Sequence, residues 1–226
     1  MTTLQIGGIL FEKMDQTDFT GPFEVLSRIP DSTFHVVGKD RAPIRDTKGL
    51  ILTPEATFEE APRLDLLVVP GGFGVNALME DETVLAFLRA QTMILSVCTG
   101  ALVCGAAGLL QGRRATTHWA SHHFLSYFGA IPVDERVVVD GNLVSTAGVT
   151  AGFDGALTVA ALLRGDSTAQ EIQLSLEYAP EPPFASGSPA TAPPEVLAAA
   201  RAALREVTDA RLEIVKRVAG RLAPAS

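Results

Sequence analysis

The chain has 226 residues and a formal net charge of −8, and 47% of its residues are hydrophobic. This length suits one large α/β domain, and the acidic balance argues against a nucleic-acid partner, because phosphate binding needs a basic face. No apolar run reaches the roughly 20 residues that a bilayer-spanning helix needs, and the N-terminus lacks the basic segment of a signal peptide. The sequence therefore predicts a soluble, cytoplasmic protein with no membrane segment.

The first half of the chain alternates short apolar runs with helical segments. Thr20 is the expected N-cap of a helix over residues 23–28, with Pro22 in its first turn. Lys48-Gly49 marks a hairpin between two short strands. Strands are predicted at 4–11, 34–37, 44–46, 50–53, 64–69 and 93–97, and a second helix at 81–90. The connection between that helix and the strand at 93 is unusually short.

The second half continues the alternation. A helix over residues 99–107, rich in Ala and Leu, is expected to end at Gly108. Asp140-Gly141-Asn142 is a strong signal for a hairpin between strands at 136–139 and 143–145. Further helices are predicted at 119–128, 150–163 and 169–177.

The C-terminal part differs in composition. Residues 179–194 are rich in Pro and form a connector that can be neither helix nor central strand. Residues 195–226 follow as a long helix whose apolar side chains recur every three or four positions. This stripe is expected to pack on the helix's own domain or on a dimer partner, and the chain is predicted to form a homodimer.

Strands that alternate with helices predict a three-layer α/β/α sandwich around a mostly parallel sheet, over residues 1–178. In such sheets ligands bind at the carboxyl ends of the strands. Two loops fall there: Gly71-Gly72 after the strand at 64–69, and Cys98 after the strand at 93–97. The first strand is expected to adjoin the strand that carries Cys98.

Cys98 stands between a buried strand and a helix, and this setting favours a nucleophile elbow over a buried core cysteine. The backbone there should be strained, and the helix N-terminus should lower the pKa of the thiol to roughly 3.5–7.5. The N–H groups of Gly72 and Thr99 are candidate donors to the thiolate or to an oxyanion. Cys104 lies within an apolar helix and is expected to be a core residue.

Asp18, ahead of the first helix, is the candidate acid and base beside Cys98, although it could merely cap that helix. His118 is a candidate base, with helix capping or packing as an equal alternative. The other histidines show no metal-ligand spacing, so no metal site is predicted.

The motifs VVPGGFG, SVCTGA and TTHWA together resemble the ThiJ/PfpI superfamily, which has a flavodoxin-like, class I glutamine amidotransferase-like fold. Within it the chain is most similar to the isonitrile hydratases, through DFTGP, ALMED, AIPVDERVVVDGNL and LEYAPEPPF among others. The resemblance implies that Asp18 does the work that a Glu does in many members. It also places Gly71, Val149 and Thr150 around the site, with Val149 replacing an Ile.

The activity that the resemblance implies is hydration of a small-molecule isonitrile to an N-substituted formamide, with no cofactor. The expected route is a covalent thioimidate on Cys98, with Asp18 as acid and then base. Two alternatives stay open: another cysteine-dependent chemistry of the superfamily, such as glyoxalase or amidase activity, and a non-catalytic cysteine redox sensor.

Overall fold

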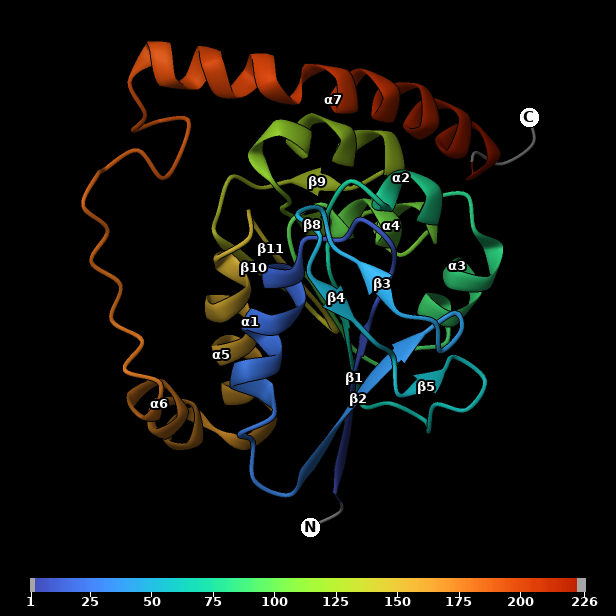
Figure 1. Cartoon of the computed structure of the whole chain (residues 1–226), viewed down its shortest axis with the longest axis vertical. Coiled ribbons are helices and arrows are strands. Elements are labelled where there is room, and N and C mark those ends of the chain that lie inside the picture. The colour runs from blue at the N-terminus through green and yellow to red at the C-terminus, as the bar shows by residue number, and fades with distance from the viewer. Residues whose placement is uncertain (1–2, 223–226) are drawn as a thin grey trace.

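A seven-stranded sheet forms the centre of the computed structural model, which describes residues 3–222 (Figure 1). The elements before the nucleophile are β1 (Leu4–Ile9), α1 (Gln16–Leu26), β2 (Ser32–Gly38), β3 (Ile44–Arg45), β4 (Ile51–Leu52), β5 (Ala56–Thr57), β6 (Leu66–Val69), α2 (Val75–Leu78), α3 (Glu82–Arg89) and β7 (Ile94–Ser96). Those after it are α4 (Gly100–Ala106), β8 (Arg114–Ala115), the 3-10 helix η1 (Trp119–Phe128), β9 (Ile131–Pro132), β10 (Val137–Asp140), β11 (Leu143–Thr146), α5 (Ala151–Arg164), α6 (Asp166–Ser175) and α7 (Pro194–Leu222).

The strand order is β10-β11-β7-β6-β1-β2-β5, and every neighbouring pair is parallel except β10 with β11. The mostly parallel sheet is therefore confirmed, as are both predicted hairpins. The prediction that β1 adjoins β7, the strand that precedes Cys98, was wrong. β6 lies between β1 and β7, so the loop after β6 separates the end of β1 from Cys98.

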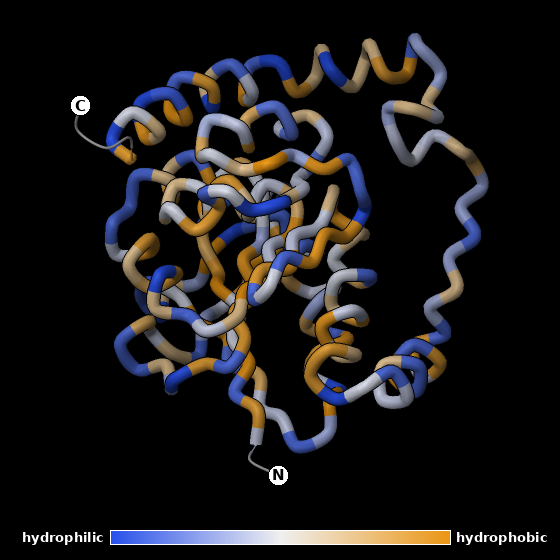
Figure 2. The backbone as a smooth tube through the Cα atoms, turned by 180° about the vertical axis from the view of Figure 1, so that it is seen from behind, coloured by the Kyte–Doolittle hydropathy of each residue, from blue (hydrophilic) through white to orange (hydrophobic). Residues whose placement is uncertain are grey.

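Helices cover both faces of this sheet, and successive residues of β6 show why. Leu66 and Val68 pack with side chains of α1 and α5, whereas Leu67 and Val69 pack with side chains of α3, α4 and η1. A strand that is apolar at every position suits a sheet buried on both sides. Figure 2 shows the apolar strands enclosed between the helical layers. The three-layer α/β/α sandwich is confirmed.

The first helix begins earlier than predicted. Asp15, not Thr20, is its N-cap, and the Asp15 side chain accepts a hydrogen bond from the Thr17 N–H at 3.1 Å. Pro22 lies inside the helix rather than in its first turn. Asp18 therefore stands in the first turn of α1 and not in the loop before it. The two-residue strands β5, β8 and β9 and the short helix α2 went unpredicted because elements of this length carry no periodic pattern.

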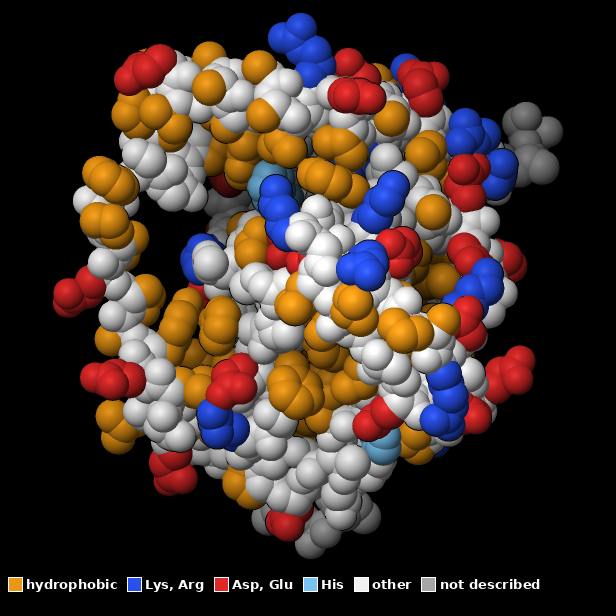
Figure 3. All heavy atoms as spheres, in the orientation of Figure 1, with side chains coloured by type: hydrophobic (Ala, Val, Ile, Leu, Met, Phe, Trp, Pro, Cys, Tyr) orange, Lys and Arg blue, Asp and Glu red, His pale blue; other side chains and the backbone are white. Residues whose placement is uncertain are grey.

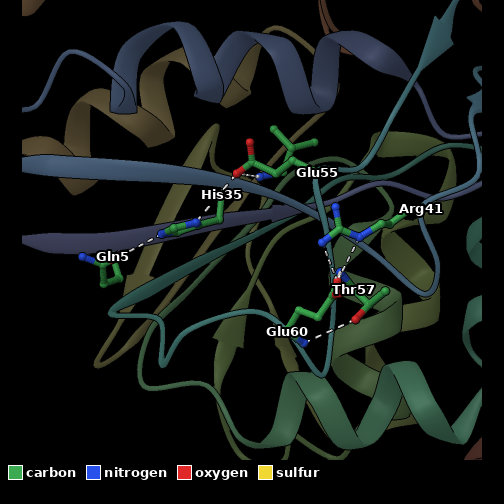
Figure 4. Close-up of polar contacts among 7 residues, drawn as sticks. Gln5, His35, Arg41, Glu55, Thr57 and Glu60 are labelled. Atoms are coloured by element: carbon green, nitrogen blue, oxygen red, sulfur yellow. Dashed lines mark hydrogen bonds and ion pairs between the residues drawn. The ribbon is translucent and has the colours of Figure 1, made fainter.

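Polar side chains fasten the sheet edge at β2 and β5 (Figure 4). His35 on β2 contacts Gln5 Oε1 on β1 through Nε2 at 2.7 Å. Beside β5, Glu60 accepts hydrogen bonds from Arg41 at 3.1 Å and from the Thr57 N–H at 2.8 Å. The hydrogen bond from Arg41 is the largest cause that lowers the pKa of Glu60, to about 2. These contacts lie far from Cys98 and stabilise the edge of the sheet.

The C-terminal helix α7 crosses the end of the molecule, over η1 and α4 (Figure 1). Its own side chains Val215 and Val218 are buried against the core, and its Arg217 pairs with Glu80 at 2.8 Å. The middle of the apolar stripe thus packs on its own chain, whereas Val196 and Leu222 at its ends are exposed. The homodimer stays a prediction. None of the helices between residues 3 and 222 is both long enough and apolar enough to cross a membrane.

Candidate active site

Cys98 occupies a tight turn between β7 and α4. Its φ is +54°, a left-handed conformation that non-glycine residues rarely adopt, so the expected strain is present. Two hydrogen bonds hold the turn: the Cys98 N–H donates to the Ala147 carbonyl at 3.0 Å, and the Thr117 hydroxyl donates to the Cys98 carbonyl at 2.6 Å. The backbone of the candidate nucleophile is therefore fixed by groups from two other segments.

The Gly71-Gly72 loop after β6 lies between α1 and the Cys98 turn. The Gly71 N–H donates to Asp18 Oδ2 at 2.9 Å. A Cβ atom on Gly71 would lie 2.5 Å from the Thr99 nitrogen and 2.8 Å from Asp18 Oδ2, too close for any side chain. Glycine at this position lets the carboxyl of Asp18 and the turn at Cys98 approach each other across one backbone segment.

Asp18 is fully buried, and burial is the main reason that its pKa rises to about 7. The charge of Asp15 raises the pKa further. The Gly71 N–H and the thiol of Cys98 lower it, because both donate to the carboxylate. The other carboxyl oxygen of Asp18, Oδ1, is buried and has no hydrogen-bond partner in the described part of the chain. Near neutral pH this carboxyl can therefore give or take a proton beside the sulfur.

The raised pKa of Asp18 predicts that stability depends on pH. An unfolded Asp loses its proton near 3.8 and native Asp18 near 7. Between these values the native state holds more protons than the unfolded state, so the free energy of unfolding falls as pH rises. The Asp18→Asn variant has no carboxyl to titrate at this position. Its melting temperature, relative to that of the unmodified protein, should therefore rise from about pH 5 to about pH 8. Thermal unfolding at both values checks this, and a gap that stays constant contradicts the raised pKa.

The pKa of Cys98 differs from the sequence-based expectation. Burial, and then the charge of Asp18, raise the pKa of this thiol well above its usual value, although the N–H groups of Val149 and Thr99 act against them. Only 6% of the residue is exposed. The expected lowering by the helix N-terminus is therefore wrong for the unliganded protein, because α4 is short and desolvation outweighs it. The thiol is neutral until a neighbouring group takes its proton.

The two expected backbone donors behave differently. Thr99 donates to the sulfur, but the Gly72 N–H donates to the Thr99 hydroxyl at 3.0 Å and is not free for an anion. Val149 supplies the second donor instead, from a backbone with φ of +23°. Thr150 is exposed, and its hydroxyl accepts a hydrogen bond from Arg136 at 3.1 Å. The Gly72 N–H thus holds the Thr99 hydroxyl and does not contact the sulfur.

His118 serves first as the N-cap of η1. Its Nδ1 accepts the Ala120 N–H at 3.3 Å, and burial lowers its pKa to about 4. A neutral imidazole that accepts at Nδ1 carries its proton on Nε2, where it can donate but not accept. This geometry favours the capping alternative over a general base. No group of three His, Cys, Asp or Glu side chains between residues 3 and 222 is arranged to hold a metal ion.

A cavity of about 200 Å³ opens at Cys98, beneath α7. It is lined by Asp15, Thr47, Lys48, Gly72, Phe73, Cys98, Thr99, His118, Ala120, Ser121, Val149, Leu204, Val207, Thr208 and Arg211. Figure 3 shows apolar side chains gathered along the side of α7 that faces the body of the protein.

The residues from α7 were not predicted for the site. One signal for them was present, because Arg211 interrupts the apolar stripe between Val207 and Ile214. A charged residue in a buried stripe needs a polar partner or a function. Cys104 contributes nothing to the cavity, since it is fully buried in the core and burial raises its pKa to about 12.

Known proteins resemble this chain in sequence and in fold. The profile of the DJ-1/PfpI family matches residues 6–162. Isonitrile hydratase of Pseudomonas putida is 54% identical over 97% of this chain and 98% of its own length. The crystal structure of a ThiJ/PfpI family protein from Pseudomonas syringae superposes with a TM-score of 0.91 at 39% identity, over 97% of this chain and 92% of that one.

A more distant relative matches this chain over only part of its own length. The HTH-type transcriptional regulator CdhR of Pseudomonas aeruginosa is 29% identical over 72% of this chain, which spans only 50% of that regulator. The family profile extends over more than half of the chain, and the hydratase matches it nearly end to end. The chain belongs to the DJ-1/PfpI family.

Proposed function

We propose that the protein is an isonitrile hydratase that uses Cys98 as nucleophile and Asp18 as acid and base. The observation that carries the proposal is the pairing of a buried thiol with a buried carboxyl, whose pKa is about 7, across the Gly71 segment. The near full-length identity with the hydratase of Pseudomonas putida supports the same chemistry. A pair that shares one proton can both attack and protonate a single carbon atom.

The first step adds the sulfur and the hydrogen of the thiol to the same atom, the terminal carbon of the isonitrile. Ionised Asp18 takes the proton of Cys98, and the sulfur then forms a bond to the isonitrile carbon. The same proton passes from Asp18 to that carbon, which gives the thioimidate R–N=CH–S–Cys98. The raised pKa values of both groups favour this route, because neither charge is stable for long in the buried site.

The second step adds water and breaks the carbon–sulfur bond. Asp18, again ionised, removes a proton from water as the oxygen attacks the thioimidate carbon, and passes this proton to the nitrogen. The tetrahedral adduct R–NH–CH(OH)–S–Cys98 collapses to the formamide R–NH–CHO, and the sulfur regains a proton. The net reaction consumes one isonitrile and one water. The N–H groups of Val149 and Thr99 are placed to stabilise the sulfur as it leaves.

The cavity favours an apolar group on the isonitrile nitrogen. Phe73, Val149, Leu204 and Val207 line it, and a volume of about 200 Å³ lies below the usual range for drug-sized ligands. We therefore expect small alkyl or aryl isonitriles as substrates. The test is the appearance of cyclohexylformamide from cyclohexyl isocyanide, followed by proton NMR with the purified protein. Formation at the rate of a buffer blank would reject the proposal.

The alternatives fit the site less well. A redox sensor needs an accessible thiolate, whereas Cys98 is buried and its pKa is raised. Another chemistry of the family would show as turnover of a glyoxal or an amide without turnover of isonitriles, so the same preparation tests it.

A further inference from the structure

Arg211 is a buried arginine that α7 places at the active-site cavity. Only 4% of it is exposed, and it lines the same cavity as Cys98. Three neutral acceptors hold the guanidinium: Asn76 Oδ1 at 2.8 Å, Ser121 Oγ at 2.9 Å and the Gly72 carbonyl at 3.3 Å. An arginine carries five N–H donors, so this arrangement fixes the group and leaves donors over.

Arg211 lacks the partner that a buried cation normally has. No carboxylate of residues 3–222 forms an ion pair with it, while three neutral groups take its hydrogen bonds. Burying a cation without a counter-ion is costly in free energy, and such groups usually face a carboxylate or an anionic ligand. An anion that forms in the cavity during the reaction would meet this requirement.

The charges around Cys98 identify that anion. Asp18 and Asp15 both disfavour a negative sulfur, and His118 is neutral because of its low pKa. Lys48 also lines the cavity but is exposed to solvent, which screens its charge. Arg211 is thus the buried cation of the described cavity lining. Burial lowers the pKa of Arg211 to about 10, and the negative charge of Cys98 acts against this lowering.

We propose that Arg211 is the counter-charge of Cys98, a fixed cation that stabilises the negative sulfur from α7 and so favours the thiolate that attacks the substrate. Arg211 acts on the reaction only through this sulfur, as a positioning residue. The inference rests on Cys98 being the nucleophile of the proposed function. It also gives α7, which lies outside the part that matches the family profile, an indirect role in the chemistry, through the charge of Arg211.

The test is alkylation of Cys98 by iodoacetamide as a function of pH, without isonitrile, with peptide mass spectrometry to separate Cys98 from Cys104. Arg211→Met should move the midpoint of the profile upward by at least about 0.5 pH unit, since a nearby charge shifts a pKa by roughly 1–3 units at contact and less at longer range. Arg211→Lys should recover at least half of that shift. Because a change in reagent access scales the rate equally at every pH, the midpoint reports the charge alone.

Arg217→Met is the matched control, since Arg217 also ties α7 to the body, through Glu80, but is exposed and lies outside the cavity. Its midpoint should stay where it is. The proposal fails if Arg211→Met leaves the midpoint unchanged, if Arg211→Lys shifts it as far as Met does, or if Arg217→Met shifts it equally. Should Arg211→Met fail to fold by circular dichroism, Arg211→Gln replaces it. A negative formamide assay leaves this test intact, and a negative alkylation result leaves the proposed function standing.

Discussion

Replacing Cys98 by Ala or Ser should lower kcat for formamide formation by at least about 10⁴-fold, because removal of a covalent nucleophile leaves only binding and electrostatic effects. Serine is the stricter variant. It keeps nearly the size of cysteine, but its hydroxyl remains protonated beside Asp18 under conditions where the thiol gives up its proton. The measurement is kcat for cyclohexyl isocyanide, with circular dichroism to establish that each variant is folded.

The second cysteine is the matched control for this prediction. Cys104→Ala should keep most of the activity and lower the melting temperature, because Cys104 is fully buried in the core and away from the cavity. An active Cys98→Ala would end the proposed mechanism. Equal loss of activity in the Cys98→Ala and Cys104→Ala variants would instead point to a defect in folding.

Asp18→Asn should lower kcat at least about 100-fold, since general acid–base catalysis contributes about 10²–10⁴ to the rate. The amide keeps an oxygen that can accept the Gly71 N–H, which donates to Asp18 Oδ2 at 2.9 Å in the unmodified protein. It cannot carry a proton between sulfur, carbon and water. Stability should not fall, because the buried charge is removed at the same time. A structural role alone would show the reverse pattern, with a lower melting temperature and an almost normal kcat.

Two variants sharpen the result for Asp18. Asp15→Asn removes a neighbouring carboxylate but keeps a side chain that can cap α1, so its effect on kcat should stay under about tenfold. Asp18→Glu keeps the charge, but its extra methylene moves the carboxyl from the position where Asp18 accepts the Gly71 N–H at 2.9 Å. It should therefore lose activity as well. Near-normal kcat in Asp18→Asn would assign the proton transfers to another group.

The elbow at Cys98 could be predicted because it is a local feature: a buried strand, a cysteine and a helix follow one another within a few residues. The layers were predictable for a similar reason, since apolar runs without alternation indicate strands buried on both faces. The start of α1 was missed because Asp15 and Thr20 are both good N-caps, and only the packed helix distinguishes them.

The remaining features of the site depend on contacts between distant segments. Arg211 reaches the cavity because α7 returns over η1 after a long connector, and no pattern in the connector encodes that path. The direction of the Gly72 N–H, toward Thr99 instead of the sulfur, follows from the shape of its loop. The pKa of Cys98 was mispredicted because burial and Asp18 act on it from outside its own strand and helix.

The covalent role of Cys98 is tested most directly by trapping the intermediate. The protein is mixed with excess cyclohexyl isocyanide, quenched with acid during turnover, digested and mapped by mass spectrometry. The account predicts that the peptide with Cys98 gains the full mass of the isonitrile, as a thioimidate requires, while the peptide with Cys104 is unchanged. Asp18→Asn should accumulate less of this adduct, because formation also needs the carboxyl. Steady formamide production with Cys98 unmodified, or the added mass on another residue, would contradict it.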